Sequence, residues 1–339
     1  MQEKKEKRKI TPVFRLARPE EEEKVIRFVN DNFDWKLPLV NRADFFEYYY
    51  KTDGLQFALA ELDGEYAAAC GYILANRGEV PDIWASVFVA RKDCSGVGIR
   101  LMSELGSLTG ARTVACNNIR ENTLNLYRFL GWTAERISHY YRIADRGSLS
   151  DFHLCRPDTL ERLPVSGDLR LTKVSEEELD NLPFPCTDSV PAKDIWYIRR
   201  RYFHYPHQSY DVWSVRENDV SLAYLVTRTV PSGENGEISV LRICDYVGPS
   251  DLIPRMGHAL DELLRDTGAE YMDCYNAGID ASLWKAAGLS ERKRDSAAVM
   301  PNYLTPPLYE NTEYFYFTNS ADRFVLFKAD GDQDRPNLK

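Results

Sequence analysis

A short segment that runs from Ala90 to Met102, ARKDCSGVGIRLM, carries two glycines one residue apart directly before apolar residues at helical spacing. The first backbone N–H groups of a helix have no partner within it, and the helix dipole makes that end electropositive. Glycines at this point let phosphate oxygens approach the main chain. The segment therefore predicts a phosphate site at the loop from Asp93 to Gly98. The alternative is a glycine turn that only lets a strand and a helix pack closely.

Regular elements on both sides position this loop. A strand at 82–91, rich in β-branched and aromatic residues, leads into it, and a helix with an apolar face follows. A strand that starts at Val13, an acidic helix and a hairpin precede them. A strand at 109–118, a short helix that ends at Gly131 and a last strand at 134–144 complete an α/β unit.

The same order of elements begins again in the second half of the chain. The clearest echo is TGARTVACNN at 109–118 against TGAEYMDCYN at 267–276, each followed by a short helix that stops at a glycine. This self-similarity predicts a duplication. The second copy has VGPSDLIPRMG in place of the glycine loop, so we expect it to have kept the fold and lost the phosphate site.

Residues 82–132 resemble the GNAT N-acyltransferase superfamily, in which an R/QxxGxG/A loop opens a helix and a later helix carries LYxxxGF. Here the loop contains Gly96 and Gly98, and the later motif is formed by Leu126, Tyr127, Gly131 and Trp132. The usual Arg or Gln at the head of the loop aligns with Asp93. Lys92 or Arg100 could supply the cation instead.

The resemblance implies an α/β fold class with two GNAT-like domains, each a mixed, mostly antiparallel twisted sheet flanked by helices. A length of 339 residues allows two domains of about 150 residues each. We expect a charged N-terminal tail at 1–12, a catalytic domain at 13–145 and a linker at 146–167. A degenerate GNAT-like domain at 168–330 and a polar C-terminal tail at 331–339 would follow.

The resemblance also implies acetyl-CoA, or another acyl-CoA, as cofactor, with its pyrophosphate on the loop and its pantetheine arm between the fourth and fifth strands. Tyr127 is the implied general acid near the thioester sulfur; the alternative is a half-buried aromatic that closes the helix against the sheet. The implied cofactor-binding residues are Val87, Phe88, Val89, Lys92, Asp93, Cys94, Ser95, Gly96, Val97, Gly98, Ile99, Arg100, Asn118, Asn122, Leu126 and Tyr127.

The acceptor site and the general base are less well marked. Asp82 and Glu79 stand before the fourth strand, and Asn117 and Asn118 close the fifth, where they could orient the acceptor or a water. Aromatic clusters lie at 45–50 and 195–213. Aromatic faces beside arginines suit sugar rings and nucleotides, but they also suit a seam between domains. The acceptor candidates are Phe46, Tyr49 and Asn117.

Composition excludes several classes of function. The formal net charge of −9 argues against a protein that binds nucleic acid through a broad basic surface. No apolar run approaches the ~18 residues of a membrane span, so we expect no membrane contact and a cytoplasmic location. The seven cysteines contain no CxxC pair and the five histidines show no ligand spacing, so no metal is expected. The acidic stretch at 330–337 has the DxDxD spacing of a calcium loop but lacks the glutamate of a complete one, so it favours a solvated terminus.

The sequence therefore predicts an N-acyltransferase, most simply an N-acetyltransferase. It would move an acyl group from acyl-CoA to a primary amine of a small molecule, with an amino sugar or nucleotide-linked amino sugar as the leading candidate. A monomer or a homodimer is expected. The alternatives are a non-catalytic CoA-binding or scaffold module and a peptide or protein N-acetyltransferase.

Overall fold

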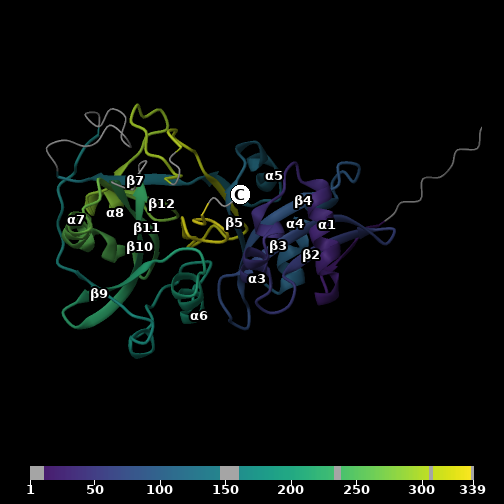
Figure 1. The fold of residues 1–339 in the computed structure, drawn as a ribbon, viewed down its shortest axis with the longest axis horizontal. Coiled ribbons are helices and arrows are strands. Elements are labelled where there is room, and N and C mark those ends of the chain that lie inside the picture. Colours follow the sequence, from purple (N-terminus) through teal and green to yellow (C-terminus); the bar gives the residue numbers. More distant parts are fainter. Residues whose placement is uncertain (1–10, 146–159, 233–237, 305–307, 337–339) are drawn as a thin grey trace, which may run out of the picture.

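The computed structural model describes residues 11–145, 160–232, 238–304 and 308–336, which form two lobes side by side in Figure 1. Most of the expected N-terminal tail at 1–12 and of the expected linker at 146–167 lies outside these residues, as do the last three residues of the chain.

The first lobe contains one sheet. Its strands are β1 (Val13–Leu16), β2 (Phe57–Leu62), β3 (Glu65–Leu74), β4 (Asp82–Ala90), β5 (Thr113–Ile119), β6 (Thr133–Arg136) and β14 (Phe315–Thr318). They follow the order β1-β2-β3-β4-β5-β14-β6. The helices of this lobe are α1 (Glu22–Asn32), α2 (Pro38–Asn41), α3 (Ala43–Tyr50), α4 (Val97–Thr109) and α5 (Leu124–Phe129).

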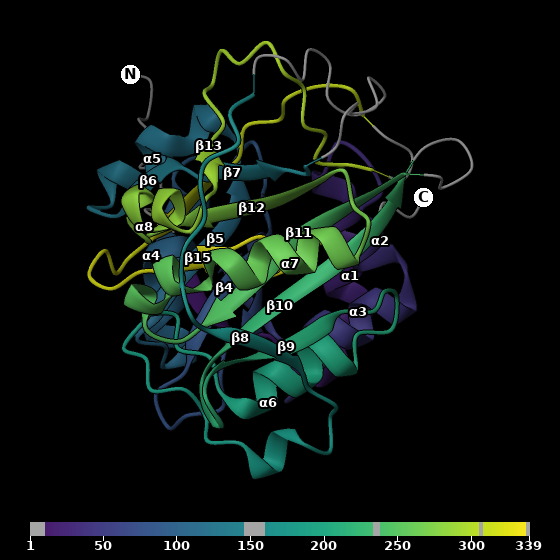
Figure 2. The same ribbon diagram turned by 90° about the vertical axis from the view of Figure 1, so that its left-hand side faces the viewer.

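The second lobe repeats this arrangement. Its strands are β7 (Ser138–Ile143), β8 (Arg170–Lys173), β9 (Asp211–Glu217), β10 (Val220–Ser232), β11 (Ile238–Val247), β12 (Tyr271–Ala277), β13 (Ser290–Glu291) and β15 (Leu326–Phe327). Their order is β13-β7-β12-β11-β10-β9-β8, and β15 also pairs with β12. The helices are α6 (Ile195–Ile198), η5 (Arg199–Phe203), α7 (Gly257–Asp266) and α8 (Ala281–Ala286). Figure 2 shows α7 lying across the sheet.

Both sheets are mixed and mostly antiparallel, and helices flank them, so the expected fold class is confirmed. The parallel pairs are β4 with β5 in the first lobe and β11 with β12 in the second. Helix α4 connects the first pair and α7 the second, as a parallel pair requires a crossover. The two lobes therefore carry the same structural unit at the same place.

Each half of the chain gives one strand to the other sheet. Strand β7 pairs with β12 and β13 in the second lobe, and β14 pairs with β5 and β6 in the first. Sheet membership therefore differs from the expected domains at 13–145 and 168–330. The crossing point is Ile137, which is buried and donates its N–H to the carbonyl of Tyr314. The pattern of residues 134–144 predicts one strand, because alternation along a strand does not reveal which sheet it joins.

The expected polar tail at 331–339 is wrong for the residues described. Gln333 and Asp334 are buried. They belong to the C-terminal segment, residues 326–336, which runs between the two lobes in Figure 1. Arg201 donates hydrogen bonds to the carbonyls of Ala329 and Gln333, while Arg228 pairs with the Asp334 carboxylate at 2.7 Å. Because buried partners satisfy its polar groups, a segment of polar composition can lie inside the protein.

A buried ion cluster holds the start of this segment. The Lys193 ammonium lies 2.5 Å from an Asp245 oxygen and 2.8 Å from an Asp330 oxygen, and all three side chains are buried. Burial opposes the charged form of Lys193, but the two carboxylates hold its pKa above the usual value. The cluster connects the loop before α6 to β11 and to the C-terminal segment.

Replacing Lys193 tests how much the fold depends on this cluster. The change Lys193→Met leaves Asp245 and Asp330 buried without their cation, so we expect the free energy of unfolding to fall by about 3–5 kcal/mol. Lys173→Met is the matched control, because Lys173 is 63% exposed and pairs with Asp211 at the surface; we expect it to change stability by less than about 0.5 kcal/mol. Urea unfolding measures both. Equal stability of the two variants would contradict a structural role for the cluster.

Candidate functional site

A large cavity opens where strands β4 and β5 separate. The two strands pair only from Asp82 to Trp84 against Thr113 to Ala115, and beyond this point they diverge. The cavity has a volume of about 830 Å³. Its lining includes the outer part of β4, the end of β5, helix α5 and the C-terminal segment. The backbone of β4 that faces the gap is therefore available to a ligand.

A bulge turns two residues of β4 toward this cavity. Cys70 of β3 pairs with Phe88 and Tyr72 pairs with Ala85, so one residue of β3 lies opposite both Ser86 and Val87. Such an extra residue bends a strand and re-aims its side chains. Ser86 and Val87 both line the cavity, together with Phe88 and Val89.

The glycine loop lies at the outer end of β4. Gly96 has a φ of +81° at the start of α4, a left-handed conformation that glycine adopts without strain. A Cβ atom at Gly98 would lie 2.9 Å from the Cβ of Ala90 and from a ring carbon of Phe88. Gly98 therefore allows α4 to pack closely on β4, which was the alternative interpretation of the loop from its sequence.

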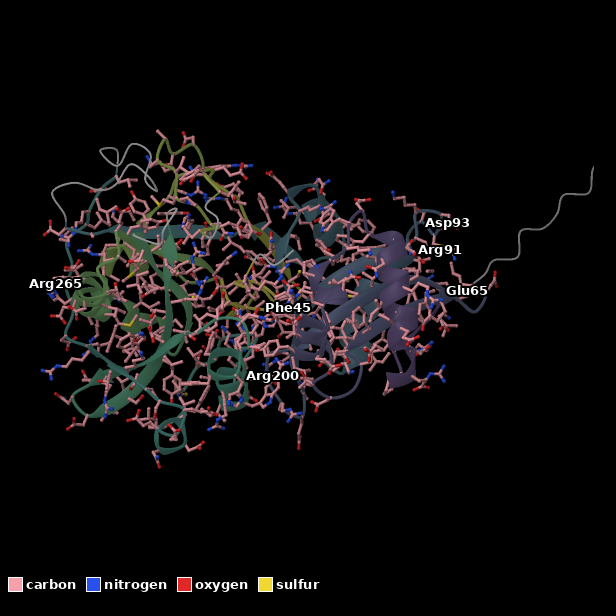
Figure 3. All side chains as sticks on the ribbon, in the orientation of Figure 1. Phe45, Glu65, Arg91, Asp93, Arg200 and Arg265 are labelled. Atoms are coloured by element: carbon pink, nitrogen blue, oxygen red, sulfur yellow. The ribbon has the colours of Figure 1, made fainter. Side chains whose placement is uncertain are left out.

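The loop also offers donors to an anion. Among the described residues, the backbone N–H groups of Gly96, Gly98 and Ile99 donate to no carbonyl. Asp93 at the loop head pairs with Arg91 at 2.6 Å, so its charge is balanced by a neighbour. Figure 3 shows both side chains at the end of the first lobe that is remote from the second. A smaller hollow of about 680 Å³ lies here, lined in part by Arg91, Lys92 and Asp93.

Tyr127 lies in the wall of the large cavity. Its ring stacks on Phe317 with the centroids 4.0 Å apart, and the residue is 5% exposed. Burial raises the pKa of Tyr127 well above its usual range, and the nearby Cys116 adds to this effect. The phenol therefore holds its proton at neutral pH, as a general acid must.

Asp332 is a carboxylate in this cavity that the sequence did not reveal. It belongs to the C-terminal segment, lines the cavity and accepts a hydrogen bond from the Ser86 hydroxyl at 2.5 Å. The Ser86 hydroxyl also lies 2.7 Å from the hydroxyl of Tyr50. Only the DxD spacing around this residue was a signal, and it is typical of an exposed terminus.

The remaining predicted residues divide into two groups. Asn118 and Tyr127 line the large cavity with Val87, Phe88 and Val89. Arg100 packs over the ring of Phe14 at 5.2 Å. The second group, to which Arg100 belongs, lines neither hollow. It consists of Cys94, Ser95, Gly96, Val97, Gly98, Ile99, Arg100, Asn122 and Leu126.

The three acceptor candidates do not line the large cavity. Phe46 and Tyr49 are buried, and the Tyr49 hydroxyl lies 3.2 Å from that of Tyr205 in the other aromatic cluster. Figure 3 shows Phe45 and Arg200 at this boundary between the lobes. The two clusters therefore form the seam that was the alternative interpretation. Asn117 instead holds the C-terminal segment, because its amide donates to the carbonyls of Phe327 and Asp330.

The corresponding gap in the second lobe is filled by the chain itself. Strands β11 and β12 pair from Val240 to Ile243 and then diverge as β4 and β5 do. Strand β15 pairs with the end of β12, and the N–H of Ala329 donates to the carbonyl of Cys244 in β11. The segment from β15 to Ala329 therefore bridges both edges of the gap.

Among the described residues no three His, Cys, Asp or Glu side chains form a group that could hold a metal ion. In the same part of the chain no helix has both the length and the apolar composition needed to cross a bilayer.

Solved structures share this architecture. A GCN5-related N-acetyltransferase from Anabaena variabilis ATCC 29413 is 15% identical, with 91% of this chain and 72% of that chain covered and a TM-score of 0.52. A probable N-acyltransferase from Enterococcus faecalis V583 is 12% identical over 92% of this chain and 73% of its own, with a TM-score of 0.49. Comparisons with protein families and with curated proteins find no match. The chain has the fold of the GCN5-related N-acetyltransferases, and the expected resemblance is confirmed for the fold.

The packing at Gly98 gives a test of the loop. The change Gly98→Ala forces α4 away from β4, so we expect a loss of about 1–3 kcal/mol in the free energy of unfolding. Gly106→Ala is the control in the same helix, because its added Cβ would lie 3.4 Å from the carbonyl oxygen of Ala111 and at ordinary distances from other atoms. We expect Gly106→Ala to cost less, since alanine favours a helix by up to about 1 kcal/mol over glycine. Thermal melting compares the two, and the opposite ranking would contradict close packing at Gly98.

Proposed function

We propose that the protein is an acyl-CoA-dependent N-acyltransferase that acts on a primary amine of a small molecule. The observation that carries the proposal is the single cavity wall that brings together the open backbone of β4, the protonated Tyr127 and the carboxylate of Asp332. The fold supports it, although a fold alone does not define a reaction. The chemistry below follows from the residues in that wall.

The first lobe fits an acyl-CoA. The gap beside β4 offers unpaired backbone groups to the amides of a pantetheine arm, and the first turn of α4 offers N–H groups and a positive dipole end to a pyrophosphate. Lys92 at the adjoining hollow adds positive charge, whereas the charge of Arg91 there is balanced by Asp93. When bound, the acyl-CoA supplies an activated acyl group and a thiolate leaving group.

Two side chains can carry out the two proton transfers that the reaction requires. An amine must lose a proton as it attacks the thioester, and Asp332, with Ser86 hydrogen-bonded to it, is a carboxylate placed to accept that proton directly or through a water. The departing thiolate must gain a proton, and the phenol of Tyr127 is protonated and can donate it. Asp332 is therefore the proposed general base and Tyr127 the proposed general acid.

The lining of the cavity favours a small acceptor. Asp34, Glu121, Glu313 and Asp332 line it, but Arg120, Arg294 and Arg335 do so too. A basic peptide would require a mainly acidic groove, so this mixed lining does not support a peptide or protein acceptor. The aromatic residues that suggested an amino sugar are buried in the seam, so they lend no support to that substrate.

Calorimetry and steady-state kinetics test the proposal. We expect acetyl-CoA to bind the wild-type protein and both Tyr127→Phe and Asp332→Asn with similar affinity, because neither change touches the loop or the backbone of β4. On a primary amine found by screening, each variant should lower kcat roughly a hundredfold, since it removes a group that moves a proton. The release of free CoA thiol measures the rate.

Asp322→Asn is the control, because Asp322 lies in the same part of the chain with its side chain 87% exposed. We expect it to keep the wild-type kcat. Failure of millimolar acetyl-CoA to bind the wild-type protein would contradict the proposal. Binding without turnover on any amine would instead favour the non-catalytic CoA-binding module.

A further inference from the structure

A second cavity adjoins the large one. It has a volume of about 490 Å³ and shares Trp35, Leu37, Gln333 and Arg335 with the lining of the large cavity. Its other walls come from strands β10 and β11, from the residues that follow β15 and from the loop at 302–304. A molecule with its amine in the large cavity could therefore extend into this one, which we call the inner pocket.

Positive charge dominates the wall of the inner pocket. Arg228, Arg242, Lys328 and Arg335 line it, whereas Asp334 is the acidic residue in its lining. Three of the cations have carboxylate partners: Arg228 pairs with Asp334 at 2.7 Å, Arg242 with the buried Asp273 at 2.6 Å, and Arg335 with Asp332 at 3.9 Å. The pocket as a whole therefore carries an excess of positive charge.

Lys328 has no carboxylate partner in the described part of the chain. The residue is 5% exposed, and its ammonium lies 4.0 Å from the ring centroid of Tyr314 and 5.5 Å from that of Tyr275. Two ring faces compensate only part of the cost of burying a charge. An anion in the inner pocket would compensate for more of it.

The groups around Lys328 determine its protonation. Burial lowers the pKa of Lys328 to about 7, and the cations Arg242 and Arg335 add to this effect, while Asp334 and Asp273 oppose it. The Asn302 amide oxygen in the same wall is buried and has no hydrogen-bond partner among the residues that the structure describes. Within the described residues, this wall therefore presents a cation that has no carboxylate partner and an acceptor that has no donor.

We infer that the inner pocket binds an anionic group of the acyl acceptor, a carboxylate or a phosphate, through Lys328 and the neighbouring arginines. The inference rests on the proposed function, since it names the class of amine that the enzyme acylates. Asn302 would accept a hydrogen bond from an N–H or O–H of the same molecule. The acceptor would then be an amine with an acidic group at its other end.

Sulfate is a suitable first probe, because its charge stays constant between pH 6 and pH 8. We expect calorimetry to detect sulfate binding to the wild-type protein at pH 6. Affinity should fall roughly tenfold at pH 8, because an ammonium with a pKa of about 7 is mostly protonated at the lower pH and mostly neutral at the higher one.

The variant Lys328→Met should lose this binding at both pH values, whereas Lys285→Met on the exposed face of α8 should behave as the wild type. Sulfate that binds at the glycine loop would remain in both variants, so the difference between them is the quantity measured. Lys328→Met should also melt no lower than the wild type, since it removes a buried charge that has no carboxylate partner. Unchanged sulfate binding in Lys328→Met, or no binding to the wild type at pH 6, would overturn the inference.

Matched amines distinguish the two anionic groups. Ethanolamine, β-alanine and O-phosphoethanolamine share a short chain and differ in having no anion, a carboxylate or a phosphate. We expect one of the two anionic amines to exceed ethanolamine at least tenfold in kcat/KM, and Lys328→Met to abolish this preference through KM. Equal kcat/KM values for all three would count against the inference.

A parallel titration with acetyl-CoA separates two kinds of failure. Binding of acetyl-CoA without binding of sulfate would overturn this inference and leave the proposed function intact. Absence of acetyl-CoA binding would overturn the proposed function itself, and with it the assignment of the anion to an acyl acceptor.

Discussion

The rest of this structure depends on one constraint, the fit of the C-terminal segment (326–336) between two pairs of diverging strands. These pairs are β4 with β5 and β11 with β12. The amide of Asn117 in β5 donates to the carbonyls of Phe327, Lys328 and Asp330, and thereby ties the segment to the first lobe. Lys193 ties the same segment to the second lobe through Asp330. Polar backbone that enters a protein interior needs such partners, because an unpaired buried carbonyl costs about 1–3 kcal/mol.

Because of this segment, the gap between diverging strands differs between the two lobes, although both lobes have the same fold. In the second lobe the segment occupies the gap between β11 and β12, with β15 paired to one strand and Ala329 bonded to the other. In the first lobe the described residues of the segment line the gap, and Asp332 is one of them. Neighbouring residues of one segment therefore close the second gap and line the first. The exchange of β7 and β14 fixes the lobes to each other, so the segment can serve both.

Much of the first lobe could be predicted from sequence, because its signals are local. Gly96 and Gly98 lie where one strand leads into the helix that follows it, and Tyr127 lies in the helix that follows the next strand. The fold brings Tyr127 into the wall of the large cavity, whereas the two glycines lie at the outer end of β4. The echo between 109–118 and 267–276 likewise predicted that the second half would repeat the fold.

The site's other half depends on contacts between residues far apart in the chain. Nothing local distinguishes Asp332 in a DxD stretch from a solvated terminus, because its burial depends on Ser86, 246 positions earlier. For the same reason, the local sequence predicts neither the strand exchange at Ile137 nor the hydrogen bonds that the Asn117 amide donates to the C-terminal segment. Phe46 and Tyr49 look like a ligand-binding face in sequence. In the structure Phe46 stacks on Phe57 of its own lobe, and Tyr49 meets Tyr205 of the second aromatic cluster.

The most direct test of this account is hydrogen exchange, followed by mass spectrometry, in the presence and absence of acetyl-CoA. If only the first gap is open, acetyl-CoA should slow exchange in peptides that cover residues 86–100. Peptides that cover residues 243–250 of the second lobe should not change. Slower exchange in the second set, or no change in the first, would contradict the claim that one copy binds the cofactor while the chain itself closes the other.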